Sequence, residues 1–393
     1  MQRRRSNGEI LTSTMITNTF FSLREGIARH RFSRGVHAVL GSALGGGFPA
    51  RARLRVLVYY HANPIGWSQV YPFFRFAGAF AAQFGAHIRA LPVENFLEGQ
   101  RGPAADVVLV QPWLSTTDAD LDTAFARYRE RHPGARMIFL DPFAQCDLRY
   151  GRAVAPHVDV YLRKALFRDR GQFLRPMPSG DTNLSEYYGA LYGVDQEPTD
   201  WQVPPELLDR LRLVPNFLTA AYLSDGFLGP EPSFSDRPID LHSRLAVKGS
   251  PWYSAMRAEA DRAARALDGV TLTPDGRIPQ AEFLDEMRRA RLCWSPFGYG
   301  ELCWRDLEAF MTGTVLVKPD MAHLETLPDL YLPGETYLPV KWDFSDLEEV
   351  TRGILADPGE QRRIALNAFR AARAYLTENR FVSDTGRDLG LDA

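Results

Sequence analysis

The chain has 393 residues and a formal net charge of −2. At ~150 residues per domain, this length predicts two domains with additional segments. Acidic and basic residues are spread over the whole chain, which argues against a nucleic-acid-binding protein held by phosphate contacts. The cysteines, Cys146, Cys293 and Cys303, are three in number and form no CxxC pair. They therefore indicate neither a disulfide framework nor a zinc site, and they favour a reducing compartment.

The N-terminal segment differs from the rest of the chain. Its basic start leads into polar residues rather than into the apolar core of a signal peptide, and no apolar run in the chain approaches the ~20 residues of a membrane helix. The glycine-rich stretch 41–47 follows no strand and precedes Pro49, so a flexible linker is expected there. We expect residues 1–52 to be an extension and the protein to be cytoplasmic. A peripheral contact of this extension with the inner face of a membrane stays open.

Residues 53–235 show apolar strands that alternate with helices and predict a Rossmann-like domain. A loop is expected over 61–72. Strands are expected over residues 55–60, 105–110, 137–140 and 158–162, and helices over 73–85, 118–132 and 205–213. Ligands of parallel sheets collect at the carboxyl ends of the strands. Those ends carry His61, Gln111 and Asp141 here.

Proline and glycine cluster between Gly226 and Pro238, which predicts the crossover to a second Rossmann-like domain over residues 236–393. Strands are expected over residues 240–245, 292–295 and 315–317, and helices over 253–267, 280–290 and 359–379. The expected fold class is α/β, with two Rossmann-like domains that face a central cleft.

The segment from Cys293 to Pro319 reads as strand, glycine-containing turn, charged helix, glycine stop and strand. The turn Phe297-Gly298-Tyr299-Gly300 precedes a helix start, where free N–H groups and the helix dipole favour an anion. Glu301, Arg305 and Glu308 are spaced four and three residues apart, so they are expected on one helix face. The same spacing also fits a ladder of salt bridges on a solvated surface.

This segment resembles glycosyltransferases of the two-Rossmann (GT-B) type, in particular the family-1-like and exostosin-like groups. The resemblance covers about residues 240–381 and is carried by Ser295-Pro296-Phe297-Gly298, Arg305-x-x-Glu308-Ala309 and Gly313 to Val317. It implies that Glu308 holds the ribose hydroxyls of a sugar nucleotide. The family places its first glutamate eight positions before the second, where this chain has Gly300 with Glu301 beside it, so the resemblance leaves the role of Glu301 open.

A second element, His242-Ser243-Arg244-Leu245-Ala246-Val247-Lys248-Gly249, is similar to the segment with which related enzymes bind the donor diphosphate, although it is one residue shorter. A forked guanidinium and an ammonium suit a pyrophosphate in the absence of a metal. The resemblance thus implies that Arg244 and Lys248 bind the diphosphate. The alternative is that both are ordinary surface cations.

The resemblance implies a metal-independent transferase that moves a sugar from a nucleotide diphosphate donor to a glycan, a lipid-linked saccharide or a small molecule, as in polysaccharide biosynthesis. The donor would be a co-substrate, and no cofactor or metal is expected. His61 or Asp141 would act as the general base if the enzyme inverts the anomeric centre. As alternatives, His61 is a structural hydrogen-bonding residue and Asp141 a turn residue. Two alternative functions stay open. The first is a sugar-nucleotide epimerase, and the second is a glycan-binding or scaffold protein without turnover.

Overall fold

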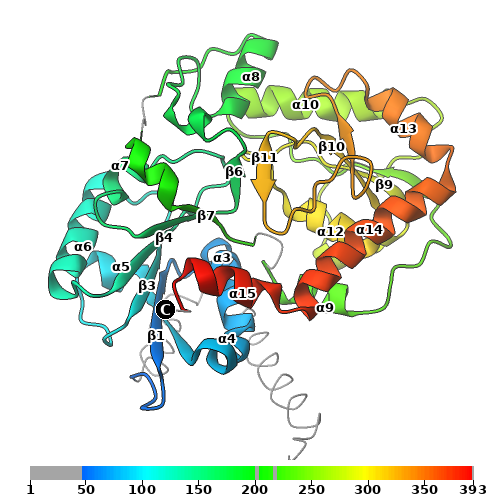
Figure 1. The fold of residues 1–393 in the computed structure, drawn as a ribbon. Coiled ribbons are helices and arrows are strands. Elements are labelled where there is room, and N and C mark those ends of the chain that lie inside the picture. Colours follow the sequence, from blue (N-terminus) through cyan, green and yellow to red (C-terminus); the bar gives the residue numbers. More distant parts are fainter. Residues whose placement is uncertain (1–46, 200–202, 216–218, 392–393) are drawn as a thin grey trace, which may run out of the picture.

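The computed structural model describes residues 47–199, 203–215 and 219–391. Two parallel sheets organise them, a six-stranded sheet with the order β2-β1-β3-β4-β5-β7 and a four-stranded sheet with the order β12-β10-β9-β8 (Figure 1). The predicted α/β class with two Rossmann-like sheets is confirmed. The expected extension and its glycine-rich linker lie outside the described residues, apart from 47–52.

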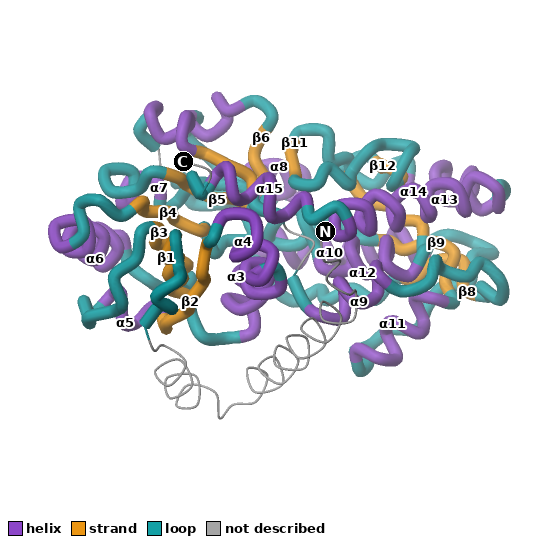
Figure 2. The backbone as a smooth tube through the Cα atoms, turned by 60° about the horizontal axis from the view of Figure 1, so that its bottom comes forward, coloured by secondary structure: helices purple, strands orange, loops and turns teal. Residues whose placement is uncertain are grey.

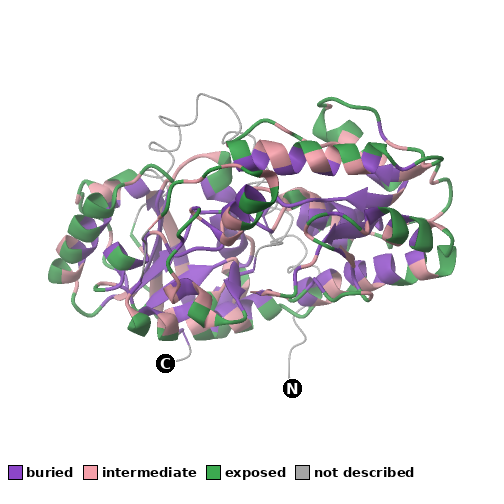
Figure 3. Cartoon of the chain, turned by 90° about the horizontal axis from the view of Figure 1, so that it is seen from above, coloured by how far each residue is buried: buried purple, intermediate pink, exposed green. Residues whose placement is uncertain are grey.

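The first lobe consists of the six-stranded sheet and helices α3 to α7. Its strands are β1 (Leu54–Tyr60), β2 (Ala86–Pro92), β3 (Val107–Gln111), β4 (Arg136–Leu140), β5 (Val160–Arg163) and β7 (Leu211–Leu213). Its helices are α3 (Pro64–Arg75), α4 (Ala77–Phe84), α5 (Val93–Leu97), α6 (Asp118–Arg131) and α7 (Gly151–Val154). The central strands are apolar without alternation because helices cover both faces of the sheet (Figure 3).

The expected loop over 61–72 is wrong, because a helix begins at Pro64. Asn63 caps this helix by accepting a hydrogen bond of 2.7 Å from the backbone N–H of Gly66. Pro64 occupies the first turn, where its missing N–H costs nothing. Pro72 lies inside the same helix, and the helical path breaks at Phe76 before α4 begins. The expected helix over 205–213 is also wrong, since a 3-10 helix (Pro205–Arg210) leads into strand β7 there.

The second lobe consists of the four-stranded sheet and helices α10 to α14. Its strands are β8 (Ile239–His242), β9 (Ala290–Trp294), β10 (Val315–Pro319) and β12 (Leu338–Val340). Its helices are α10 (Pro251–Arg265), α11 (Gln280–Arg288), α12 (Trp304–Thr312), α13 (Leu347–Leu355) and α14 (Pro358–Thr377). A parallel bridge between Leu241 and Leu272 extends the sheet beyond β8. Figure 2 shows the two groups of strands at opposite ends of the molecule.

Both sheets follow the same connectivity. In the first sheet, β1 lies between β2 and β3. In the second, β8 lies between β9 and Leu272, which joins the sheet through the single parallel bridge, so that the strand order reverses at β1/β3 and at β8/β9. Ligands of open parallel sheets bind beyond the carboxyl ends of the strands at this point of reversal. The residues that follow β1 and β8, His61 and Ser243, are therefore at the two places where a ligand is expected.

Several elements connect the lobes. Strand β6 (Ala165–Phe167) pairs antiparallel with β11 (Leu324–Thr326) between them (Figure 1). Helix α8 (Asn183–Tyr192) packs on α10, and α9 (Ala221–Leu228) packs on α12 and α14. The last helix, α15 (Arg380–Asp388), returns to the first lobe and packs on α4. There Phe381 contacts Phe73, Phe76 and Phe80 at ring-centroid distances of 5.4, 5.3 and 5.8 Å.

The predicted boundary between residues 235 and 236 stays a prediction, and elements from both sides of it pack across it. Over the described residues, every helix is too short or too polar to cross a membrane.

Candidate functional site

The site begins with two arginines that reach the carboxyl end of β8 and β9 from different helices. Arg257 lies on α10 and is 4% exposed, and its Nε and Nη1 atoms are buried without a hydrogen-bond partner among the described residues. Arg305 lies in the first turn of α12, and its Nε and Nη1 atoms are also buried without a hydrogen-bond partner among the described residues. Its Nη2 donates to the backbone oxygen of Arg244 at 3.2 Å. Burial, and then the positive charge of Arg305, lower the pKa of Arg257.

Two more unsatisfied polar side chains stand at the end of β8. His242 is fully buried and its edge-on neighbour is Phe283 at 4.7 Å. Glu286 Oε2 lies 3.7 Å from its Nε2, and neither ring nitrogen has a hydrogen-bond partner among the described residues. Burial, followed by the charge of Arg305, lowers the pKa of His242 to about 4, so the ring is neutral at pH 7. The Ser243 hydroxyl is also buried and unsatisfied. Arg257, Arg305, His242 and Ser243 thus bring hydrogen-bonding atoms without protein partners among the described residues to the same strand ends, where they can bind a polar ligand.

The start of α12 is fixed by a buried ion pair. Asp306 and Lys318 are both fully buried, with 3.1 Å between Oδ2 and Nζ. Asp306 also accepts hydrogen bonds from the Ser295 hydroxyl at 2.6 Å, the Tyr331 hydroxyl at 2.9 Å and the backbone N–H of Cys303 at 3.1 Å. The carboxylate thereby caps the helix that carries Arg305.

Glu308 lies one turn after Arg305 on α12, as expected. It is 7% exposed, and its Oε1 accepts a hydrogen bond of 2.8 Å from the hydroxyl of Tyr222 on α9. Burial raises the pKa of Glu308, and hydrogen bonds from Tyr222 and Gln280 oppose this shift. Arg257 and Arg305 are called the guanidinium pair below. A carboxylate beside this pair that can still accept hydrogen bonds can bind a pair of hydroxyl groups.

The surroundings of Arg244 and Lys248 differ from those of Arg257 and Arg305. Arg244 is bound in a bidentate ion pair by Glu286, with Nε–Oε2 and Nη2–Oε1 distances of 2.6 Å, and its Nη1 donates to the backbone oxygens of Asp275 and Gly276. Its guanidinium is therefore occupied. Lys248 is exposed on the loop before α10. The diphosphate contacts implied for these two residues stay a prediction.

The glycine turn lies against both lobes. An added Cβ at Gly298 would meet Arg257 Nη2 at 3.7 Å, whereas one at Gly300 would overlap the carbonyl oxygen of Ala144 in the first lobe. Tyr299 stacks on Tyr253 with 4.5 Å between the ring centroids, and Tyr299 is 39% exposed. Phe297 is fully buried in the core. Only Gly298 and Tyr299 of this turn thus lie beside the arginines or open to solvent.

The expectation that Glu301 shares a helix face with Arg305 and Glu308 is wrong, because α12 begins at Trp304. Glu301 lies in the preceding loop and is 1% exposed. Its Oε1 accepts a hydrogen bond of 3.0 Å from Asn183 Nδ2 and lies 3.3 Å from His323 Nε2. None of the ion pairs among the described residues joins Glu301, Arg305 and Glu308, so the salt-bridge ladder is also absent there.

At the reversal point of the first sheet, His61 forms a pair with Glu94. The distance between His61 Nδ1 and Glu94 Oε1 is 3.0 Å, and the imidazole stacks on Trp113 at 4.6 Å. The carboxylate orients the ring and favours the tautomer that leaves Nε2 as the acceptor. This arrangement can remove a proton from a hydroxyl group placed next to Nε2.

Asp141 is buried in a saturated network. It forms an ion pair with Arg163 Nη1 at 2.8 Å, accepts a hydrogen bond from the backbone N–H of Phe143 at 2.8 Å and accepts another from the Tyr161 hydroxyl. The side chain is 1% exposed. These bonds occupy both carboxylate oxygens, so the position supports the structural alternative rather than a general base.

Sequence reasoning missed Arg257, Glu94, Tyr222 and the unsatisfied state of His242. Arg257 had a detectable signal, because it lies four residues after Tyr253 and three before Ala260, on the buried face of α10. A charged residue on an apolar face is unusual unless it is paired or used. Among the described residues, no group of three or more carboxylate, histidine or cysteine side chains has the arrangement of a metal site.

No protein-family model and no curated protein matches the chain. Solved structures with a similar fold include an α-glucosyltransferase in complex with UDP and DNA, with 9% identity, coverage of 84% of this chain and 99% of that chain, and a TM-score of 0.46. A sucrose-phosphate synthase from Thermosynechococcus elongatus has 14% identity, coverage of 85% and 98%, and a TM-score of 0.45. At such low identities and TM-scores, the likeness carries no argument about substrate or mechanism.

Proposed function

We propose that the chain is a glycosyltransferase that moves a sugar from a nucleotide diphosphate donor to a hydroxyl group of an acceptor. The observation that carries the proposal is the pair of guanidinium groups, Arg257 and Arg305, at the strand-order reversal of the second sheet, whose buried Nε and Nη1 groups have no hydrogen-bond partner among the described residues. A dianionic or trianionic ligand supplies the missing acceptors and offsets the repulsion between the two cations.

The diphosphate of the donor fits this position chemically. Guanidinium groups bind phosphate oxygens in a bidentate way, and charge that develops on the departing diphosphate is stabilised by preorganised donors in a site without water. Two arginines supply this charge stabilisation from the chain itself, so the proposed transfer uses no metal and no further cofactor. Ser243 and the N–H groups at the start of α12 add neutral donors to the same anion.

Glu308 and His61 complete the proposed site. Glu308 stands one turn further into the helix, where its carboxylate would accept hydrogen bonds from the ribose hydroxyls. In the first lobe, His61 would remove the proton of the acceptor hydroxyl, with Glu94 as the residue that orients it and stabilises the imidazolium. The products are the glycoside, the nucleoside diphosphate and the proton held at first by Nε2.

The experiment is a thermal-shift titration with UDP, GDP, ADP and dTDP. A ligand of the native state raises the melting temperature by mass action. We expect a shift with one nucleotide, weakened roughly 10- to 100-fold in apparent affinity in Arg257→Met, because a charge-assisted hydrogen bond contributes about 1.5–3 kcal/mol. The matched control is Arg262→Met on the same helix, an exposed arginine that pairs with Glu259. It should bind like the unmodified chain.

Four other outcomes decide against the proposal. If no nucleotide shifts the melting temperature, or if Arg262→Met weakens binding as much as Arg257→Met, the guanidinium pair is not a donor site. If the nucleotide sugar binds and is converted without an acceptor to a second sugar nucleotide, the enzyme is an epimerase. If it binds and is recovered unchanged with every acceptor tested, the chain is a binding or scaffold protein.

A further inference from the structure

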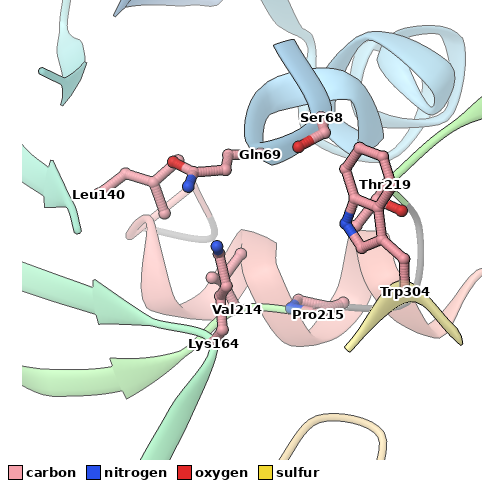
Figure 4. Close-up of a pocket in the computed structure, with 8 residues that line it drawn as sticks. All are labelled: Ser68, Gln69, Leu140, Lys164, Val214, Pro215, Thr219 and Trp304. Atoms are coloured by element: carbon pink, nitrogen blue, oxygen red, sulfur yellow. The ribbon is translucent and has the colours of Figure 1, made fainter. Parts of the chain in front are cut away.

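A small pocket lies between the lobes on the first-lobe side of α12. Its volume is about 20 Å³, enough for one water molecule or one small substituent. The residues that line it come from both lobes and are Ser68, Gln69, Leu140, Lys164, Val214, Pro215, Thr219 and Trp304 (Figure 4). Trp304 begins α12 and directly precedes Arg305 in the chain.

Lys164 supplies the only charge among these lining residues. It lies between β5 and β6, and within the described residues its amine has no hydrogen bond and no ion pair. Burial and then the charge of Arg163 lower the pKa of Lys164 to about 8. The nearby carboxylate of Asp141 favours the charged amine, but its oxygens are already bound to Arg163, Tyr161 and Phe143. The amine therefore lacks a counter-ion of its own.

Two neutral polar groups in the pocket are also unsatisfied. Gln69 is 7% exposed, and its Nε2 donates to the backbone oxygen of Pro142 at 2.9 Å while its Oε1 has no partner among the described residues. Thr219 is equally buried, and its hydroxyl has no partner there either. Figure 4 shows the side chains of Gln69 and Lys164 extending toward each other from opposite walls. The lining of the pocket thus includes an amine, an amide oxygen and a hydroxyl without hydrogen-bond partners among the described residues.

Trp304 forms the wall on the other side. Its side chain is 45% exposed, which is unusual for a tryptophan at the first position of a helix that is otherwise largely buried. An exposed indole face beside polar groups is a suitable surface for the apolar face of a sugar ring. A ring that lies on Trp304 would place one substituent in the pocket, since the volume admits no more.

We propose that this pocket selects acceptors that carry a carboxylate, with the carboxylate bound by the Lys164 amine and the sugar ring against Trp304. The inference rests on the proposed function, and it adds the chemical class of the acceptor. A carboxylate matches a single ammonium in charge, and its oxygens can accept hydrogen bonds from the Lys164 amine. A phosphate would carry more charge than this single amine offsets.

The test measures protection of Lys164 in the full-length chain. The amine is acetylated with trace acetic anhydride, and its modification is quantified by mass spectrometry with no addition, with galactose, with acetate and with galacturonate. Galacturonate and galactose share a ring and differ at C6, and acetate supplies the carboxylate alone. We expect galacturonate to slow acetylation of Lys164 severalfold, acetate to slow it less and galactose not to slow it. Lys341, an exposed lysine, reports any general effect of the additives.

Variants give a second readout that does not depend on labelling. Galacturonate should raise the melting temperature of the unmodified chain and of Lys341→Met, and the apparent affinity for galacturonate should weaken about tenfold or more in Lys164→Met. The inference is overturned if galacturonate protects no better than galactose, or if Lys164→Met keeps the full shift. Nucleotide binding to Arg257→Met tests the donor site separately. The donor site can be present without the preference for a carboxylate, and the pocket can bind a carboxylate without a donor site.

Discussion

The ammonium of Lys318 lies 3.1 Å from the carboxylate of Asp306, and neither side chain is exposed. This pair holds the first turn of α12 and hence Arg305. Lys318→Met leaves the carboxylate buried without its cation, and we expect a loss of about 3–5 kcal/mol in the free energy of unfolding. Urea denaturation measures it. Lys248→Met, which changes an exposed lysine, should stay within about 0.5 kcal/mol of the unmodified chain. Equal stability of both variants would show that the ion pair contributes nothing.

Gly300 approaches the first lobe too closely to bear a side chain. An added Cβ would overlap the carbonyl oxygen of Ala144, so Gly300→Ala must displace the turn or separate the lobes locally. We expect a loss of about 1–3 kcal/mol, as for overpacking elsewhere, and weaker nucleotide binding. The control is Gly353→Ala on α13, where an added Cβ has no neighbour within 4 Å and should stabilise the helix slightly. A Gly300→Ala chain as stable as the control would contradict the contact.

Glu308 predicts a pH dependence. Burial raises its pKa above the ordinary value of 4.5, so between that value and the raised pKa the folded chain holds more protons than the unfolded chain. Stability therefore falls as pH rises through this window, and it levels off above the raised pKa. Glu308→Gln removes the ionisation, so its stability relative to the unmodified chain should improve as pH rises from below 4.5 to 7.

Denaturant melts of both chains across this pH range measure the effect, and nucleotide binding supplies the functional readout. Glu308→Gln keeps a hydrogen-bond acceptor for Tyr222 but loses the charge, so we expect roughly tenfold weaker binding of the nucleotide. A relative stability that improves toward acid pH would mean that the carboxylate stabilises the fold instead.

The His61–Glu94 pair predicts a separation of catalysis from donor binding. If His61 is the general base, His61→Asn should lower the transfer rate by about 10²- to 10⁴-fold. Glu94→Gln should lower it less, because it removes only the charge that orients and stabilises the ring. Neither change should alter the nucleotide affinity. His87→Asn on β2 is the control for loss of an imidazole in the same sheet. Transfer that survives His61→Asn would indicate a mechanism without this base.

Local sequence patterns predicted those parts of the fold that depend on local physics. The strands β1, β3 and β10 are continuous apolar runs, and the helix α6 has acidic residues early and basic residues late. Strand β2 was not predicted because it alternates His87 and Arg89 with apolar residues at the edge of the sheet. Helix α3 was not predicted because it contains Pro72, and proline usually breaks a helix.

The candidate site was predictable only in part, for a non-local reason. Arg305 and Glu308 follow from the spacing within one helix. The proximity of Arg257 to Arg305 depends on how α10 and α12 are placed around the second sheet, and the ion pair of Arg244 depends on Glu286 from α11. Similarly, Lys164 becomes part of a pocket only when Trp304 of the other lobe approaches it. Pairings of this kind are set by the tertiary fold and leave no periodic signal in the chain.

The exchange of elements between the lobes has a consequence for dividing the protein. Helices α8 and α9 precede the predicted boundary but cover α10, α12 and α14, and α15 follows it but covers α4. A fragment that ends at residue 235 would expose Tyr188 and Phe227 and leave the Phe73 and Phe80 rings without Phe381. The complementary fragment would carry the matching bare surfaces. The lobes are therefore not exchangeable modules, and two halves made separately would regain a folded state only by assembling with each other.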